Sequence, residues 1–234
     1  MNNQFETKDV VSSQQGTLAE FYSRVYAILA IGIMISGVTA YVTTEFFYYQ
    51  LMSALSSLPL GFILLWIVQI ALVLFLSAKS FSNPTMAMGG FVAYSFLNGI
   101  TLSMTLATYG IGAMGRAFIA ASLTFGVMAV FGSRTKKDLS GLGRAAFILL
   151  IGIIITMVIN FFMASTAVDY FVTFLTVIVF AGLTAYDNQM IKNFYYNAQQ
   201  NQQSLAGIAV FCALQLYMDF INLLMAFARI FSRD

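Results

Sequence analysis

The sequence predicts an all-α integral membrane protein with seven transmembrane helices, and three observations favour that class. Of the 234 residues, 60% are hydrophobic and only 9% are charged, whereas an ordinary soluble domain carries about 25% charged residues. The charges are separated by uncharged stretches, several of them as long as a membrane span, which needs about 20 mainly apolar residues. The polar residues inside those stretches form narrow stripes, as in helices that pack against one another in lipid.

The expected spans follow from the gaps between charges. The first gap lies between Arg24 and Glu45 and holds one span. The gaps that end at Lys79 and at Arg116 are the longest, and each holds a span together with a polar or Pro-containing turn. The remaining gaps hold one span each. The predicted spans are 25–44, 59–78, 85–107, 113–132, 145–164, 169–190 and 205–230.

The basic residues predict how the chain is oriented. Residues 1–24 are polar and lack the apolar core of a signal peptide, so they form a tail before the transmembrane domain at 25–231. With this tail in the cytoplasm, eight Lys and Arg residues fall inside and three outside, as the positive-inside rule requires. Seven spans then place the C-terminus outside. The inside residues are Lys8, Arg24, Lys79, Arg134, Lys136, Lys137, Arg144 and Lys192, and the outside ones are Arg116, Arg229 and Arg233.

Several function classes are excluded by composition. The chain has no His and a single Cys, Cys212, so it offers no Ser-His-Asp triad, no His-ligated metal site, no zinc knuckle and no internal disulfide. A net charge of +2 does not indicate a basic surface of the kind that binds nucleic acid. We therefore expect no resident cofactor and no nucleic-acid partner. Any group that titrates near neutrality is expected to be a carboxylate.

Most polar residues inside the spans are expected to serve helix packing. Gly32, Ser36 and Ala40 repeat every four residues and predict a seam for close helix contact. Asn98 lies on the polar face of the third span, and we keep it as a supporting residue of a functional site.

Asp219 does not fit a packing role. It lies near the middle of the seventh span, where an aspartate costs about 2.5 to 3.5 kcal/mol to insert. Gln215, Asp219 and Asn222 are spaced i, i+4 and i+7, which places them on one face of the helix. The alternative is a buried neutral carboxyl that is held by hydrogen bonds.

Asp187 is the second candidate, in the sixth span. Thr184 and Asn188 cluster with it on one side of the helix, and Lys192 follows one turn later and could reach back to it. The alternatives for Asp187 are a neutral carboxyl held by hydrogen bonds and a helix-end cap.

The two aspartates would form a specific kind of site if they meet. Two carboxylates a few ångströms apart cannot both ionise cheaply, so the pair titrates as a unit. When ionised, the pair offers oxygen ligands that suit weakly bound Ca²⁺ better than a transition metal. Asp219 lies about 21 Å along its helix from the cytoplasmic end, and Asp187 only about 5 Å from it. Contact therefore requires a tilted seventh helix or a longer sixth one.

Three segments resemble a known family. Residues 181–189 (Ala-Gly-Leu-Thr-Ala-Tyr-Asp-Asn-Gln) are similar to the tyrosine-aspartate motif of the Bax inhibitor family, the transmembrane Bax inhibitor motif proteins. Residues 216–224 (Leu-Tyr-Met-Asp-Phe-Ile-Asn-Leu-Leu) resemble its final-helix motif, and residues 135–141 (Thr-Lys-Lys-Asp-Leu-Ser-Gly) resemble its basic loop. The resemblance covers nearly the whole chain from the first span onward and is closest to the bacterial branch. Asn188 stands where the family usually has Thr, and Met218 where it usually has Leu.

The resemblance implies more than the residues alone establish. It implies six helices around a central seventh, a location in the bacterial cell (inner) membrane, and a pH-sensitive Ca²⁺ leak. Asp187 and Asp219 would be the paired aspartates that sense pH and hold the ion transiently. Some members place a basic partner at the end of the second helix, and Lys79 stands there in this chain. A lysine would pair as a point charge, without the bidentate geometry of arginine.

Two alternatives to the leak remain open. The first is a regulatory protein that acts on a membrane-bound AAA-type quality-control protease, as is thought of some bacterial relatives. The polar tail and the Gln/Asn-rich stretch 197–203 would be its contact points, or else plain solvated segments. The second is an intramembrane aspartyl protease, for which two aspartates are the minimum. Its second motif should read Gly-x-Gly-Asp, but this chain reads Leu-Tyr-Met-Asp at 216–219, and we therefore expect no enzyme.

Overall fold

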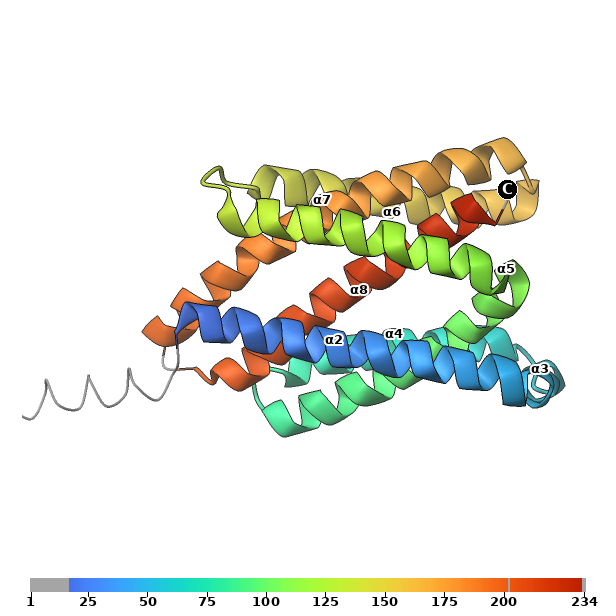
Figure 1. The fold of residues 1–234 in the computed structure, drawn as a ribbon, viewed down its shortest axis with the longest axis horizontal. Coiled ribbons are helices and arrows are strands. Elements are labelled where there is room, and N and C mark those ends of the chain that lie inside the picture. Colours follow the sequence, from blue (N-terminus) through green and yellow to red (C-terminus); the bar gives the residue numbers. More distant parts are fainter. Residues whose placement is uncertain (1–16, 202, 233–234) are drawn as a thin grey trace, which may run out of the picture.

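The computed structural model describes residues 17–201 and 203–232, and every regular element within them is a helix. Figure 1 shows long helices that run between two opposite ends of the molecule, where short connections join them. The predicted all-α class is therefore confirmed. The elements are α2 (Leu18–Val42), the π-helix η1 (Thr43–Phe47), α3 (Tyr48–Ser57), α4 (Gly61–Lys79), α5 (Pro84–Arg134), α6 (Ser140–Met163), α7 (Thr166–Gln200) and α8 (Leu205–Phe231).

The first helix begins earlier than the sequence predicted. Most of the expected tail at 1–24 lies outside the described residues, but α2 already starts at Leu18. Thr17 and Glu20 form a capping box: the Glu20 N–H donates to the Thr17 hydroxyl (3.3 Å), and the Thr17 N–H donates to the Glu20 carboxylate (2.6 Å). These bonds satisfy backbone groups that a helix start leaves open, so the helix extends past the apolar segment.

Within the described residues, six helices are long and apolar enough to cross a membrane, one fewer than the seven predicted spans. The difference lies in α5, a run of 51 residues over both expected spans 85–107 and 113–132. A straight helix of that length would measure about 77 Å, more than twice the hydrocarbon thickness of a bilayer. Gly110 interrupts it with φ 79° and ψ 160°, and Figure 1 shows α5 turning back on itself.

Gly110→Ala is expected to lower the stability of the protein by about 1–3 kcal/mol, because the φ and ψ of Gly110 are open almost only to glycine. The loss is backbone strain alone, since a Cβ at Gly110 would meet nothing within 4 Å. Thermal unfolding in detergent measures the effect. Gly112→Ala is the matched control, because Gly112 has open space around it and no positive φ. Equal melting temperatures for the two variants would contradict this account of the turn.

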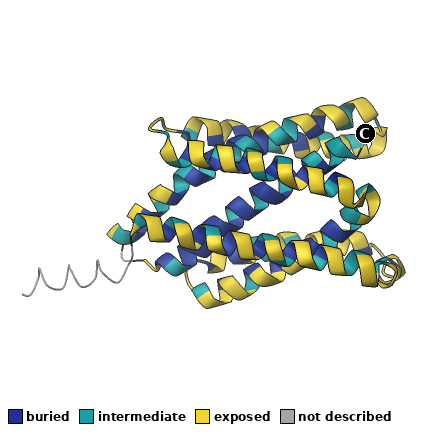
Figure 2. Ribbon diagram, viewed as in Figure 1, coloured by how far each residue is buried: buried dark blue, intermediate teal, exposed yellow. Residues whose placement is uncertain are grey.

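The last helix forms the core. Seventeen of the 27 residues of α8 are buried, which is the largest buried share of any spanning helix. Figure 2 shows its buried residues running between the outer helices. The main packing partners of α8 are α5, α7 and α2, whereas α4 packs on α5 and α6 packs on α7. The expected ring of six helices around a central one is therefore incomplete, because α4 and α6 lie in an outer position.

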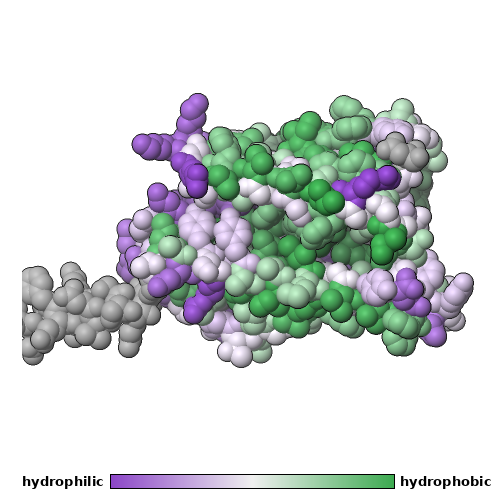
Figure 3. Space-filling view, in the orientation of Figure 1, coloured by the Kyte–Doolittle hydropathy of each residue, from purple (hydrophilic) through white to green (hydrophobic). Residues whose placement is uncertain are grey.

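The outer helices are apolar on nearly every side. Only Gly61 and Leu76 are buried in α4, and only Gly143, Ala146 and Ile153 in α6. Their large apolar side chains, among them Trp66 and Ile148, are mostly exposed. Figure 3 shows a hydrophobic band across the middle of the molecule, with most hydrophilic residues at its ends. Apolar surface of this extent indicates a lipid environment.

The predicted small-residue seam of α2 is confirmed as a packing surface. Gly32, Ser36 and Ala40 are all buried. The Ser36 hydroxyl donates to the Ser95 carbonyl of α5 (2.7 Å) and lies 2.6 Å from the Tyr217 hydroxyl of α8. A buried polar group must find such partners, so these contacts fix how the three helices meet.

Candidate functional site

The two candidate aspartates lie at matching depth, because α7 is longer than the sequence predicted. The helix continues past residue 190 to Gln200, and a short connection leads into α8 at Leu205. Asp187 lies about 20 Å from the C-terminal end of α7, and Asp219 about 21 Å from the N-terminal end of α8. The two helices are antiparallel neighbours across that connection, so equal distances from it bring the two carboxyl groups level.

The carboxyl groups of Asp187 and Asp219 are close enough for the two side chains to interact directly. Asp219 is only 3% exposed, and its Oδ2 has no hydrogen-bond partner among the described residues. The Thr184 hydroxyl is a second neighbour of Asp219, and it donates to the Phe180 carbonyl of its own helix (2.7 Å). A hydrogen bond between two carboxyl groups requires a proton on one of them. The pair can therefore hold one shared proton or, when it is fully ionised, face a cation.

Close backbone packing holds α7 in place beside the pair. Gly132 of α5 lies directly against the Ala185 backbone: a Cβ at Gly132 would come within 2.7 Å of the Ala185 carbonyl carbon. Gly143 of α6 lies under the Tyr186 ring in the same way. Glycine allows this approach because it has no side chain. Both contacts immediately precede Asp187 in the chain, so they set the position of its turn of helix.

Two tyrosines of α2 hold the residue after Asp187. Tyr22 donates its hydroxyl to the Asn188 carbonyl (2.9 Å), and the Tyr26 hydroxyl donates to Asn188 Oδ1. Asn188 is fully buried, and its Nδ2 donates to the Thr184 carbonyl (2.7 Å). Neither tyrosine was predicted from the sequence as a site residue. Their spacing of four residues, which places them on one face of α2, was the available signal.

The other predicted site residues are not brought to the pair by any described contact. Lys79 is exposed at the end of α4, which packs on α5, and it forms no ion pair with a described residue. Lys192 is also exposed, and the expected reach back to Asp187 is not seen. The amides of Asn98 and Asn222 donate to carbonyls of their own helices, Tyr94 and Met218 (3.2 and 2.8 Å). Gln215 is half-buried on α8. The supporting roles of these residues stay predictions.

The basic loop between α5 and α6 is tied to α7 next to the pair. The Leu139 N–H donates to Gln189 Oε1 (2.8 Å), and Gln189 Nε2 donates to the Lys137 carbonyl (2.8 Å). Asp138 in this loop is exposed, and hydrogen bonds from Ser140 hold the pKa of its carboxyl below the usual value. Asp138 is therefore ionised throughout the neutral range and is not a candidate for a group that titrates there.

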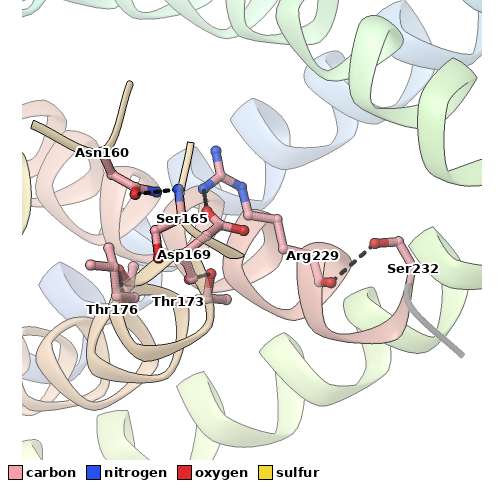
Figure 4. A network of polar contacts seen from close by, with 8 residues as sticks. Asn160, Ser165, Asp169, Thr173, Thr176, Arg229 and Ser232 are labelled. Atoms are coloured by element: carbon pink, nitrogen blue, oxygen red, sulfur yellow. Dashed lines mark hydrogen bonds and ion pairs between the residues drawn. The ribbon is translucent and has the colours of Figure 1, made fainter. Parts of the chain in front are cut away.

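A second polar cluster joins the opposite end of α8 to α6 and α7. Arg229 Nη1 lies 3.5 Å from Asp169 Oδ1, and Ser165 donates its N–H to Asn160 Oδ1 (3.0 Å), as Figure 4 shows. Three of these residues line an open pocket of about 300 Å³. Each side chain of the ion pair is one-third exposed, and pairs of that kind contribute about 0–1 kcal/mol. We interpret this cluster as a tie between helix ends.

A tightly bound metal ion finds few protein ligands at the aspartate pair. Within residues 17–201 and 203–232, no three His, Cys, Asp or Glu side chains come together. Ca²⁺ takes six to eight oxygen ligands in its protein sites, so a pair of carboxylates leaves most positions to water or backbone oxygens.

Comparison with known proteins gives one family. The model of the family described as "Inhibitor of apoptosis-promoting Bax1" matches residues 18–234. An uncharacterized membrane protein of Streptococcus pyogenes serotype M1 is 36% identical over 217 residues, which cover 93% of this chain and 94% of that one. The inner membrane protein YbhL of Escherichia coli K12 is 34% identical over 234 residues, with 98% of each chain covered. The protein YrjE of Lactococcus lactis is 36% identical over 215 residues, covering 92% and 91%.

Proposed function

Because the chain belongs to the Bax inhibitor family of membrane proteins, we propose that it is a pH-sensitive leak for Ca²⁺ whose gate is the pair Asp187 and Asp219. One observation carries the proposal: these two carboxyl groups are neighbours between α7 and α8 of an apolar helical bundle, with Asp219 buried and Asp187 half-buried. The other described acidic residues lie at helix ends, in loops or in exposed positions. They are Glu20, Glu45, Asp138 and Asp169.

The proposed gate works through the charge of the pair. With one shared proton, the pair keeps α7 and α8 together by a hydrogen bond and leaves little charge to attract a cation. Loss of that proton places two negative charges side by side, which repel each other and attract Ca²⁺. Asp219 Oδ2 is buried without a hydrogen-bond partner among the described residues, so a cation or water that reached it would supply the missing partner. Ca²⁺ is thus the transported ion, and the protein needs no resident cofactor.

The proposal includes an arrangement in the membrane. We count the two arms of α5 on either side of Gly110 as separate spans, which gives seven. The N-terminus lies in the cytoplasm of a bacterial cell, the protein crosses its inner membrane, and the C-terminus lies outside. The distribution of described basic residues supports this orientation, because the end of the molecule where α2 begins holds most of them. They are Arg24, Lys79, Arg134, Lys136, Lys137, Arg144 and Lys192, against Arg116 and Arg229 at the other end.

We propose no catalytic role for the pair. An aspartyl protease needs room for a peptide beside its aspartates, but Leu216, Tyr217 and Phe220 around Asp219 are all buried in packed contacts. The regulatory alternative has one favourable observation, the exposed polar end of α7 with Asn193 and Asn197. Association with a membrane-bound AAA-type protease through that end would be tested by pulldown with full-length protein and with Asn193 and Asn197 changed to Ala.

The test of the leak is Ca²⁺ flux into proteoliposomes measured across the neutral pH range. We expect the wild-type protein to pass Ca²⁺ at a rate that changes with pH, and liposomes without protein to show neither property. A reconstituted, folded protein that passes no Ca²⁺ at any pH would overturn the proposal. The effect of changing the aspartates themselves is considered in the Discussion.

A further inference from the structure

We infer that Tyr22 and Tyr26 are positioning residues that strap α2 to α7 through Asn188 and so hold Asp187 against Asp219. This inference rests on the proposed function only for its consequence on flux. The strap itself is a statement about which contacts hold α7, and it can be tested without any ion. We use "strap" below for the contacts of Tyr22 and Tyr26 with Asn188.

The strap uses both oxygen atoms of one buried residue. Tyr22 occupies the Asn188 backbone carbonyl and Tyr26 the side-chain carbonyl, while the side-chain amide bonds Thr184 within α7. The two rings lie nearly parallel, with centroids 6.3 Å apart and planes inclined at 22°, so one tyrosine supports the other. Asn188 is 0% exposed, and an unpaired amide there would be costly.

The remaining contact between α2 and α7 is small. α2 packs mainly on α5 and α8. Besides the strap, the rings of Phe21 of α2 and Tyr195 of α7 are in contact, with centroids 5.5 Å apart. The strap therefore supplies the described polar link between these helices. Consecutive residues are about 100° apart around a helix, so fixing Asn188 also fixes the direction in which Asp187 points. A small rotation of α7 would turn Asp187 away from Asp219.

The single cysteine offers a reporter for this contact. Cys212 is 2% exposed, and it lies seven residues before Asp219 on α8, on the same helix face. It is near enough to both Tyr22 and Asp187 to interact with them electrostatically. The titratable groups around the strap are Asp187 and Tyr196 of α7, Cys212 and Asp219 of α8, and the two tyrosines themselves. Loosening the strap should open a path to the Cys212 thiol.

The experiment measures the reaction rate of Cys212 with a small membrane-permeant maleimide in proteoliposomes. We expect Tyr22→Phe and Tyr26→Phe each to raise the rate several-fold and the double variant to raise it about 10-fold or more, since two part-buried hydrogen bonds to Asn188 are lost. Tyr26→Phe should add little in an Asn188→Ala background, because both changes remove the same bond. Cys212→Ala should abolish labelling, which confirms the reacting residue.

Tyr217→Phe is the matched control. It removes a buried phenol hydroxyl from the contact between α2 and α8 and leaves the strap intact. A labelling rate that rises equally in this variant would show general loosening and overturn the inference. Unchanged labelling in Tyr22→Phe and Tyr26→Phe would also overturn it, and the single variants keep the test valid if the double variant does not fold.

Calcium flux in the same vesicles separates the two proposals. If the tyrosine variants are labelled faster and their Ca²⁺ flux has a pH profile different from that of the wild type, the result supports both the strap and the leak. Faster labelling of a protein that passes no Ca²⁺ in its wild-type form supports the strap and contradicts the leak. Wild-type flux with unchanged labelling in the tyrosine variants supports the leak and contradicts the strap.

Discussion

Asp219→Asn is expected to make Ca²⁺ flux through the protein independent of pH in the neutral range. The change keeps the size and shape of the side chain but removes its ability to lose a proton. The pair can therefore no longer change between the state with one shared proton and the state with two ionised carboxylates. For the wild type, the ratio of the flux at neutral pH to the flux at acidic pH should differ clearly from one. For Asp219→Asn, the same ratio should be about 1. Flux measured in proteoliposomes at stepwise pH values checks this.

The partner variant sharpens the test. Because the two aspartates titrate as a unit, Asp187→Asn should flatten the profile as well, and the double variant should resemble either single one. Asp169→Asn is the control, since Asp169 lies on the same helix α7 but is partly exposed and close to Arg229 at its far end. It should keep the wild-type profile. An unchanged pH profile in Asp219→Asn would remove the pair from the gate.

Gly132→Ala is expected to destabilise the protein by about 3 kcal/mol, which is the upper part of the range for overpacked cores. The added methyl group would collide with the backbone of Ala185, and a backbone cannot rotate out of the way as a side chain can. Relief requires α7 to move away from α5 at Ala185, two residues before Asp187. The melting temperature in detergent should therefore fall by several degrees.

The control for that change lies in the same arm of α5. Gly126 is exposed, and a Cβ there would meet nothing within 4 Å. Gly126→Ala should therefore leave stability unchanged or raise it by up to about 1 kcal/mol, because alanine favours the helix. Equal melting temperatures for Gly132→Ala and Gly126→Ala would mean that α5 and α7 do not approach as closely as described.

Membrane class and most helix positions could be predicted from the sequence because both depend on local composition. A segment of about 20 apolar residues has few stable options other than a helix in lipid. The start of α8 at Leu205 therefore agrees with the predicted span at 205–230, and the end of α4 at Lys79 is one residue past that predicted. The helix ends that differ, at Leu18 and Gln200, lie in polar segments where capping and packing decide.

Asp187 and Asp219 were also identified from sequence, because charge is so scarce in this chain that two aspartates within apolar segments stand out. Hydropathy and spacing report how one helix meets lipid, and so they could single out these residues one at a time.

Only the tertiary structure decided that Asp187 and Asp219 lie next to each other. Contact depends on the extra length of α7 and on backbone contacts such as that of Gly132 with Ala185. The outer position of α4, the exposure of Lys79 and the bonds from Tyr22 to Asn188 depend likewise on residues far apart in the chain, whose approach no local pattern records.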